Sequence, residues 1–280
     1  MSRLLKNELA IITGGGRGIG RAIAMRFASE GCNIVLVSRT ISELQDTATF
    51  ILKAYQVQVS FYAIDISNEL EVKSMVNKVH GIYGKISILV NNAAVIGPIG
   101  EVSTIDGKEF MDTLSINVGG TFFCTKAVIP YMKNQINGSI INLSGGGGLS
   151  SFPFYDAYSA SKSAIVRLTE NFALELEKYK INVTAISPGA INTKMFDDQL
   201  KVDKELLGKS NWENLQKQVI SGGDSTDKAS ELALFLVCQK DRIFSGRVIS
   251  AVWDNWEEIA KTKITDSNMF KMRRIVSKKN

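Results

Sequence analysis

Short apolar segments alternate with amphipathic segments of helical length along most of the chain. This alternation is typical of a parallel sheet whose strands are joined by crossover helices. The pattern predicts strands at residues 9–13, 33–38, 57–64, 86–91, 139–144, 182–187 and 247–251. It predicts helices at residues 18–30, 42–54, 68–80, 107–132, 156–179 and 226–238. Several strands are apolar almost throughout, which indicates that helices cover both faces of the sheet.

No linker or low-complexity segment divides the chain, which has 280 residues and only four prolines. We therefore expect one doubly wound α/β domain over residues 1–280. Residues 192–227 form a long, polar and weakly patterned stretch. Because structureless insertions of this length are usually functional or disordered, we expect a mobile substrate loop there.

Composition excludes several classes of protein. Three cysteines and one histidine are too few for a Cys/His zinc site, and we expect neither a metal nor disulfides. No apolar run approaches the roughly 18 residues of a membrane span, and the first residues lack the apolar core of a signal peptide. These features predict a cytoplasmic protein that does not bind membranes.

The formal net charge is +5, and its one concentration is the basic tail at residues 271–279. A tail of this kind can bind nucleic acid, which would make the binding sensitive to salt and to truncation after Ser267. No nucleic-acid recognition motif accompanies the tail. We therefore expect a solvated tail and no nucleic-acid partner.

The first strand runs into the sequence TGGGRGIG at residues 13–20, and a helix follows directly. Glycines let backbone amides approach a pyrophosphate at a helix N-terminus, so this loop is a candidate dinucleotide site. The residue at the end of the second strand selects the cofactor in such sites, and here Ser38 and Arg39 stand there without a carboxylate. Arg39 and the loop residue Arg17 therefore favour the 2′-phosphate of NADP (NADPH).

Lys162 lies four positions after Tyr158, and this spacing places a phenol and an ammonium on one face of a predicted helix. The ordinary pKa of tyrosine is about 10, and a neighbouring cation favours the phenolate. We therefore expect Lys162 and a nicotinamide cation to lower the pKa of Tyr158 into the range of a general acid/base.

Together these motifs resemble the classical short-chain dehydrogenase/reductase family over nearly the whole chain. The features that match, in chain order, are the 13–20 loop, Asp65, the NNAA sequence at residues 91–94, Asn117, Ser144, Tyr158 with Lys162, and Pro188-Gly189 followed by Thr193. The resemblance implies a Rossmann-type sheet with strand order 3-2-1-4-5-6-7. It also implies pairing of helices 107–132 and 156–179 across a twofold axis, giving a homodimer or homotetramer.

The resemblance implies a role for each matching residue. Tyr158 would exchange a proton with the substrate oxygen, Lys162 would hold the nicotinamide ribose, Asn117 would position a water, and Ser144 would bind the substrate oxygen. The cofactor-binding set would be Gly14, Gly16, Arg17, Gly18, Ile19, Gly20, Ser38, Arg39, Asp65, Ile66, Asn91, Ala93, Tyr158, Lys162, Pro188, Gly189, Ile191 and Thr193. Local backbone hydrogen bonding is an alternative role for Asn91 and Asn117.

The chain departs from the family pattern at two places. Ala94 replaces the usual glycine of the NNAG-type turn. The family's serine usually lies thirteen residues before the tyrosine, where this chain has Gly145, and Ser144 lies one residue earlier. We expect Ser144 to take the role, with the extra residue absorbed as a bulge among the four glycines that follow; Ser150 and Ser151 are the alternatives.

The sequence thus predicts an NADP-dependent oxidoreductase that interconverts an alcohol and a carbonyl compound. A catalytically silent NADP-binding sensor or scaffold is the alternative, because the serine is displaced and the C-terminal region is unusual. Steroid, sugar, acyl and polyol substrates all remain open. Trp253 and Trp256 fit either packing, in the core or at a subunit interface, or stacking against a sugar-like ligand, and we expect packing.

Overall fold

The computed structural model describes residues 3–262, 264 and 266–273, and it contains a seven-stranded parallel sheet. The strand order is β3-β2-β1-β4-β5-β6-β7, as the family resemblance implied. The strands are β1 (Leu9–Thr13), β2 (Asn33–Ser38), β3 (Val59–Ala63), β4 (Ile88–Asn91), β5 (Gly138–Leu143), β6 (Ile181–Ser187) and β7 (Val248–Ser250). The predicted strands are confirmed, with differences of at most two residues at their ends.

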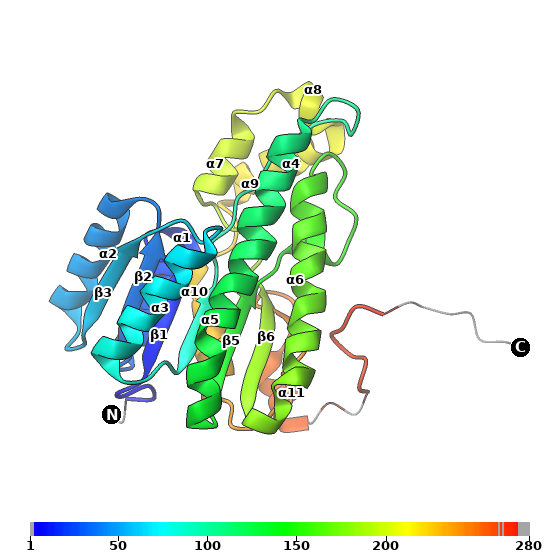
Figure 1. Ribbon diagram of the computed structural model, residues 1–280. Helices are drawn as coiled ribbons and strands as arrows, with labels where there is room; N and C mark the ends of the chain where they lie inside the picture. Colours follow the sequence, from blue (N-terminus) through cyan, green and yellow to red (C-terminus); the bar gives the residue numbers. More distant parts are fainter. Residues whose placement is uncertain (1–2, 263, 265, 274–280) are drawn as a thin grey trace, which may run out of the picture.

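Helices cover both faces of the sheet (Figure 1). The core on one face is formed with α1 (Gly18–Ser29), α2 (Ile41–Ala54) and α10 (Thr226–Cys238). The core on the other face is formed with α3 (Glu69–Tyr83), α5 (Gly120–Gln135) and α6 (Asp156–Glu175). Successive strand residues alternate between these cores: Ile11 packs in the second and Ile12 in the first. Burial on both faces explains why the central strands are apolar throughout.

The predicted helix at 107–132 is interrupted. It consists of α4 (Gly107–Leu114), one π-helical turn at Ser115–Gly119, and then α5. Single π turns inside α-helices frequently mark functional sites. Asn117, a candidate site residue, lies in this turn.

Residues 192–227 differ from the expected structureless loop. They contain α7 (Lys194–Leu200), α8 (Lys204–Leu207) and α9 (Lys209–Ser221), which lie together beyond one end of the sheet, beside α4 (Figure 1). Phe196, Leu207 and Leu215 form a separate apolar cluster with the fully buried Tyr155. The amide of Asn211 also donates to the carbonyl of Pro153 at 3.0 Å. Contacts with a distant segment therefore stabilise helices whose own pattern is weak.

The segment after β7 is also more ordered than its sequence indicates. Helix α11 (Trp256–Thr262) follows, and Trp256 packs against Phe235 with ring centroids 4.7 Å apart, as core packing predicts, whereas the core-packing expectation is wrong for Trp253, which is 86% exposed. Arg273, at the start of the basic tail, forms a 2.6 Å ion pair with the buried carboxylate of Glu170. The remaining tail, residues 274–280, lies outside the described residues. The ion pair of Arg273 therefore holds the described part of the tail, residues 271–273, against α6.

The helices assigned to a twofold interface expose less apolar surface than expected. Ile165, Phe172 and Leu176 of the second helix and its C-terminal end are buried within the chain's own core. Phe122 of α5 is 40% exposed and Met111 of α4 is 60% exposed. Leu174 of α6 is 72% exposed, so all three helices leave an apolar side chain in solvent. None of the helices among the described residues is long and apolar enough to cross a membrane.

Candidate active site

The glycine loop joins β1 to α1 at the carboxyl end of the sheet's central strand. Gly14 and Gly18 have φ angles of 65° and 52°, in the left-handed region that side chains disfavour. A Cβ on Gly20 would lie 2.3 Å from the carbonyl oxygen of Gly14, so only glycine lets α1 pack this closely on the loop. Arg17 precedes α1 without a side-chain cap, which leaves the first amides of the helix available to an anion.

Asn92 and Thr13 hold this loop in place. The side-chain amide of Asn92 donates to the carbonyl oxygens of Thr13 at 2.9 Å and Gly14 at 3.2 Å. The hydroxyl of Thr13 accepts from the backbone amides of Asn92 and Ala93 at 3.0 and 3.1 Å.

The side chain of Asn91, the first asparagine of the NNAA sequence, is not hydrogen-bonded to the glycine loop. Asn91 is buried and donates to Thr125 and Asn142, so its side chain does not line the cleft that the resemblance implied.

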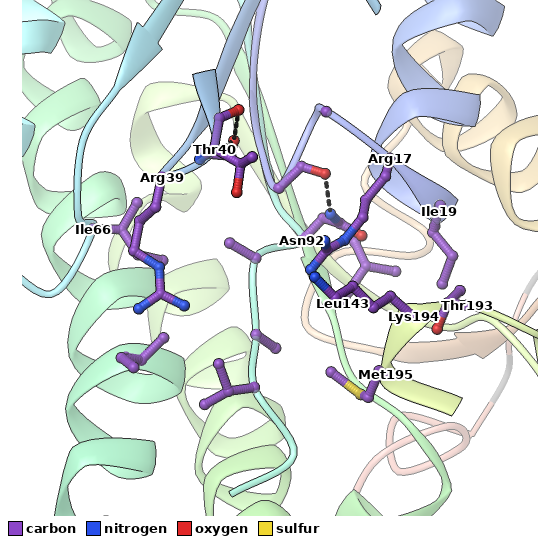
Figure 2. Close-up of a pocket in the computed structure, with 18 of the residues that line it drawn as sticks. Arg17, Ile19, Arg39, Thr40, Ile66, Asn92, Leu143, Thr193, Lys194 and Met195 are labelled. Atoms are coloured by element: carbon purple, nitrogen blue, oxygen red, sulfur yellow. Dashed lines mark hydrogen bonds between the residues drawn. The ribbon is translucent and has the colours of Figure 1, made fainter. Parts of the chain in front are cut away.

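The glycine loop borders a cleft, which we name the glycine-loop cleft (Figure 2). Fourteen of the residues assigned to cofactor binding line it: Gly14, Gly16, Arg17, Gly18, Ile19, Ser38, Arg39, Asp65, Ile66, Ala93, Tyr158, Lys162, Pro188 and Thr193. Gly20 lies behind the loop, and Gly189 and Ile191 line a neighbouring cavity instead. Thus the structure brings most of the sequence-predicted set to one cleft, although the residues come from the ends of five strands and from α6.

Two carboxylates accompany the two arginines of the cleft. Arg17 forms a 2.6 Å ion pair with Glu43 of α2, and Arg39 lies 4.0 Å from Asp65. The expectation that no carboxylate stands near the selecting position is therefore wrong. Glu43 is separated from Arg17 by 26 residues, and only the packing of α2 on the loop brings the two together. Figure 2 shows Arg17 and Arg39 entering the cleft from different elements.

A second cavity opens beside the glycine-loop cleft, under α7 and the turn after β7; we name it the lid cavity. Tyr158 and Ser144 line both spaces. A molecule in the cleft and a molecule in the lid cavity would therefore meet at the Tyr158 hydroxyl and the Ser144 hydroxyl.

Tyr158 and Lys162 lie on one face of α6, with the Lys162 ammonium 5.5 Å from the centre of the phenol ring. Lys162 is buried and donates to the Leu143 carbonyl at 2.8 Å. Burial raises the pKa of Tyr158 to about 12 and lowers the pKa of Lys162 to about 8. Desolvation disfavours both charged forms, and the lowering of the Tyr158 pKa by Lys162 together with a nicotinamide cation stays a prediction for the cofactor-bound protein.

We expect the lowered pKa of Lys162 to appear as a pH-dependent stability. Between about pH 8 and 10.5, the unfolded state keeps the Lys162 proton while the folded state loses it. The contribution of Lys162 to the free energy of unfolding should therefore rise with pH in this window, by up to about 1.4 kcal/mol per pH unit, whereas Cys32 and Cys124, whose pKa burial raises, contribute the opposite slope. Urea unfolding of the wild type and Lys162→Met across this range measures the difference. Parallel stability curves for the two proteins would contradict it.

Asn117 is fully buried, and its side chain is held by the protein. Its amide oxygen accepts from the backbone of Val95 at 2.8 Å, and its amide nitrogen donates to the Val95 carbonyl and to Ser161, both at 2.9 Å. These hydrogen bonds reach residues 22 and 44 positions away, so they differ from the local bonding named above, and the water-positioning role stays a prediction. They connect the π turn to the segment that follows β4 and to α6, which carries Tyr158.

Ser144 and Gly145 lie differently with respect to the Tyr158 hydroxyl. Ser144 donates its backbone amide to Ile186 at 2.8 Å and continues the β5–β6 pairing, and the next glycines form a short 3₁₀ turn rather than a bulge. The Ser144 hydroxyl is buried without a hydrogen-bond partner. A Cβ at Gly145 would lie 3.0 Å from the Tyr158 hydroxyl. The backbone position that faces the phenol is therefore Gly145, and Ser144 supplies a free hydroxyl beside it.

Sequence reasoning did not assign several residues of the cleft to it, among them Glu43, Asn92 and Lys194. Asn92 belongs to the motif that was recognised, so its neighbour Asn91 was assigned in its place. Glu43 sits in the first turn of an ordinary amphipathic helix, and its sequence carries no signal of a site. Among the described residues, no group of His, Cys, Asp or Glu could hold a metal ion.

Comparisons with known proteins agree with this arrangement. The model of the short chain dehydrogenase family matches residues 8–203, more than half of the chain. A levodione reductase of Leifsonia aquatica is 33% identical over 196 residues, covering 70% of this chain and 73% of the reductase. A 3-oxoacyl-acyl-carrier-protein reductase of Staphylococcus aureus is 32% identical over 243 residues, covering 86% and 94% of the two chains.

A solved structure gives the same result for the fold. The crystal structure of an NAD⁺-bound xylitol dehydrogenase superposes with a TM-score of 0.82 at 29% identity, covering 88% of this chain and 98% of the other. The glycine loop, the sheet order and the Tyr158–Lys162 pair thus occur together in a chain with relatives of known chemistry. The chain belongs to the short-chain dehydrogenase family of oxidoreductases.

Proposed function

We propose that the protein is an NADP-dependent enzyme that interconverts an alcohol and a carbonyl compound. The observation that carries the proposal is the position of Tyr158, which lines both the glycine-loop cleft and the lid cavity. The cofactor fits the cleft through the uncapped amides of α1, the two arginines and the buried Lys162. When bound, it supplies or accepts the hydride.

The residues of the chain would move the proton. In the reducing direction, the substrate carbon gains a hydride, and the Tyr158 hydroxyl gives its proton to the substrate oxygen, which leaves an alcohol and a phenolate. The Lys162 ammonium stabilises that phenolate. Ser144 donates a hydrogen bond to the substrate oxygen as negative charge develops there. Asn117 keeps the π turn and α6 in register.

The proposal is tested with a panel of carbonyl compounds and alcohols, monitored by the absorbance of NADPH. The panel begins with keto sugars, keto acyl esters and cyclic ketones, and it includes NADH in parallel. Turnover of at least one compound supports an enzyme. Tight NADPH binding without turnover of any compound would instead support the sensor.

The cofactor preference is expected to favour NADPH by about 2 to 4 kcal/mol, because two arginines face the cleft and each charge-assisted hydrogen bond contributes about 1.5 to 3 before screening. Glu43 opposes this preference by pairing with Arg17. Titration of both cofactors measures the ratio of their dissociation constants. Added salt should reduce it.

Substitutions test the same assignment. Ser38→Asp with Arg39→Leu should reverse the preference, and Glu43→Gln should increase it. Lys53→Leu, which removes an exposed cation at the far end of α2, is the control. The NADP assignment is wrong if the ratio of the two dissociation constants is the same in the double variant and in the wild type.

We also propose that the protein is a homodimer or homotetramer in the cytoplasm. Phe122 and Met111 leave an apolar area on α4 and α5, and symmetric pairing is the usual way to cover such a face. The three cysteines are unpaired, as expected in a reducing compartment. Light scattering at micromolar concentration should show at least twice the chain mass; a monomer would contradict the oligomer.

A further inference from the structure

The lid cavity carries information about the substrate that the family assignment does not. Its volume is about 490 Å³, which suits a small molecule. No described residue that lines it bears a charge. The glycine-loop cleft next to it is different, since Arg17, Arg39 and Lys194 all line that space.

This absence of charge selects against anionic substrates. A carboxylate or phosphate in the lid cavity would lose water without gaining a cationic partner, and such transfers are costly. An uncharged molecule carries no such penalty. Neutrality is therefore a requirement on the substrate.

The cavity nevertheless offers hydrogen bonds. The Ser144 hydroxyl has no partner in the protein. Gln199 and Gln218 line the cavity, and each donates one amide hydrogen to a protein oxygen, that of Met195 at 3.1 Å and that of Asn192 at 2.8 Å. The amide oxygen and the second N–H of each remain for a ligand, and hydroxyl groups can pair with both. Ile96, Phe152 and Phe196 share the lining and offer apolar contact to the carbon atoms of such a ligand.

Trp253 adds an aromatic surface at the rim of the cavity. Its side chain is 86% exposed, yet its backbone is held in a tight turn after β7. Ser250 accepts from the Trp253 amide at 3.1 Å, and Asp254 accepts from the Ser250 amide at 2.7 Å. The turn holds the backbone of Trp253 in place, so ligand binding need not order that backbone. Its exposed ring at the rim of the cavity offers a surface on which a ligand can stack.

The backbone of three successive glycines, residues 145–147, forms part of the wall of the lid cavity. Gly145 leaves the side of the phenol free of a side chain, and a Cβ at Gly146 would meet nothing within 4 Å. The space beside the Tyr158 hydroxyl is therefore open to a substrate, whereas a side chain at position 145 would occupy it.

We propose that the lid cavity binds an uncharged polyhydroxy compound, a polyol or an unphosphorylated sugar, stacked on Trp253 and hydrogen-bonded to Ser144, Gln199 and Gln218. This inference rests on the proposed function for the reaction at Tyr158. It assigns to Trp253 a role in substrate specificity that the sequence motif alone left open.

The experiment separates binding from turnover. Calorimetry on the cofactor-loaded protein would compare sorbitol, xylitol, myo-inositol and fructose with sorbitol phosphate, gluconate and cyclohexanone, and steady-state kinetics would follow with the same compounds. We expect at least one polyhydroxy compound to be bound and turned over, with kcat/KM at least tenfold above every anionic compound and above cyclohexanone. Trp253→Ala should raise its KM about tenfold with little change in kcat, which corresponds to the loss of one stacked aromatic contact. Phe50→Ala, an exposed aromatic on α2 outside the cavity, is the matched control.

Each other outcome is decisive. Preference for an anionic compound, or for cyclohexanone, would overturn the polyhydroxy assignment while leaving the proposed function intact. Polyol binding without turnover would support the cavity assignment and overturn the proposed function. Failure of every polyhydroxy compound to bind, or an unchanged KM in Trp253→Ala, would overturn the inference itself.

Discussion

Replacement of Tyr158 with phenylalanine is expected to lower turnover by about 10²-fold or more while cofactor binding survives. The ring keeps its packing between the glycine-loop cleft and the lid cavity, but the transferable proton is lost. A positioned acid/base contributes about 10² to 10⁴ in rate, which sets this range. Steady-state kinetics and cofactor titration on the same preparation measure the two effects separately.

Tyr155→Phe is the matched control for this variant. Tyr155 lies three residues before Tyr158, is fully buried against Phe152, and has a hydroxyl without a hydrogen-bond partner. Loss of that hydroxyl should therefore leave turnover near the wild-type value. Activity retained in Tyr158→Phe would show that the tyrosine does not exchange the proton, and would favour the sensor.

Replacement of Ser144 with alanine has the second largest expected effect, a loss of about 10²-fold in turnover. Its hydroxyl is buried, free of partners and adjacent to both spaces that meet at Tyr158. A donor aimed at the substrate oxygen is worth about this factor when removed. The affinity for the cofactor should change little, because Lys162 and the glycine loop remain in place.

Ser150→Ala and Ser151→Ala provide the comparison, since both serines are exposed and follow the glycine turn. If one of them loses activity and Ser144→Ala does not, the later serine binds the substrate oxygen. If all three variants remain active, Tyr158 works without a serine partner. In that case no serine hydroxyl is needed to bind the substrate oxygen.

Local pattern was sufficient for the sheet and for the glycine loop. β1 and β2 have the predicted ends, because each is a short apolar run bounded by turn residues. The lid helices were missed for the opposite reason. Phe196, Leu207 and Leu215 give no clear period, and their burial depends on Tyr155, which lies at least 40 residues away in the chain.

The site shows the same division. The sequence by itself determined the glycines that α1 requires and the Tyr158–Lys162 pair, because these depend on residue type at fixed short spacing, whereas the strand order was an expectation implied by the family resemblance. Only the tertiary structure decided that Glu43 pairs with Arg17, that Asn92 rather than Asn91 holds the loop, and that burial raises the Tyr158 pKa. Those facts depend on distances and desolvation between segments far apart in the chain, and such quantities exist only once the sheet has brought its strand ends together.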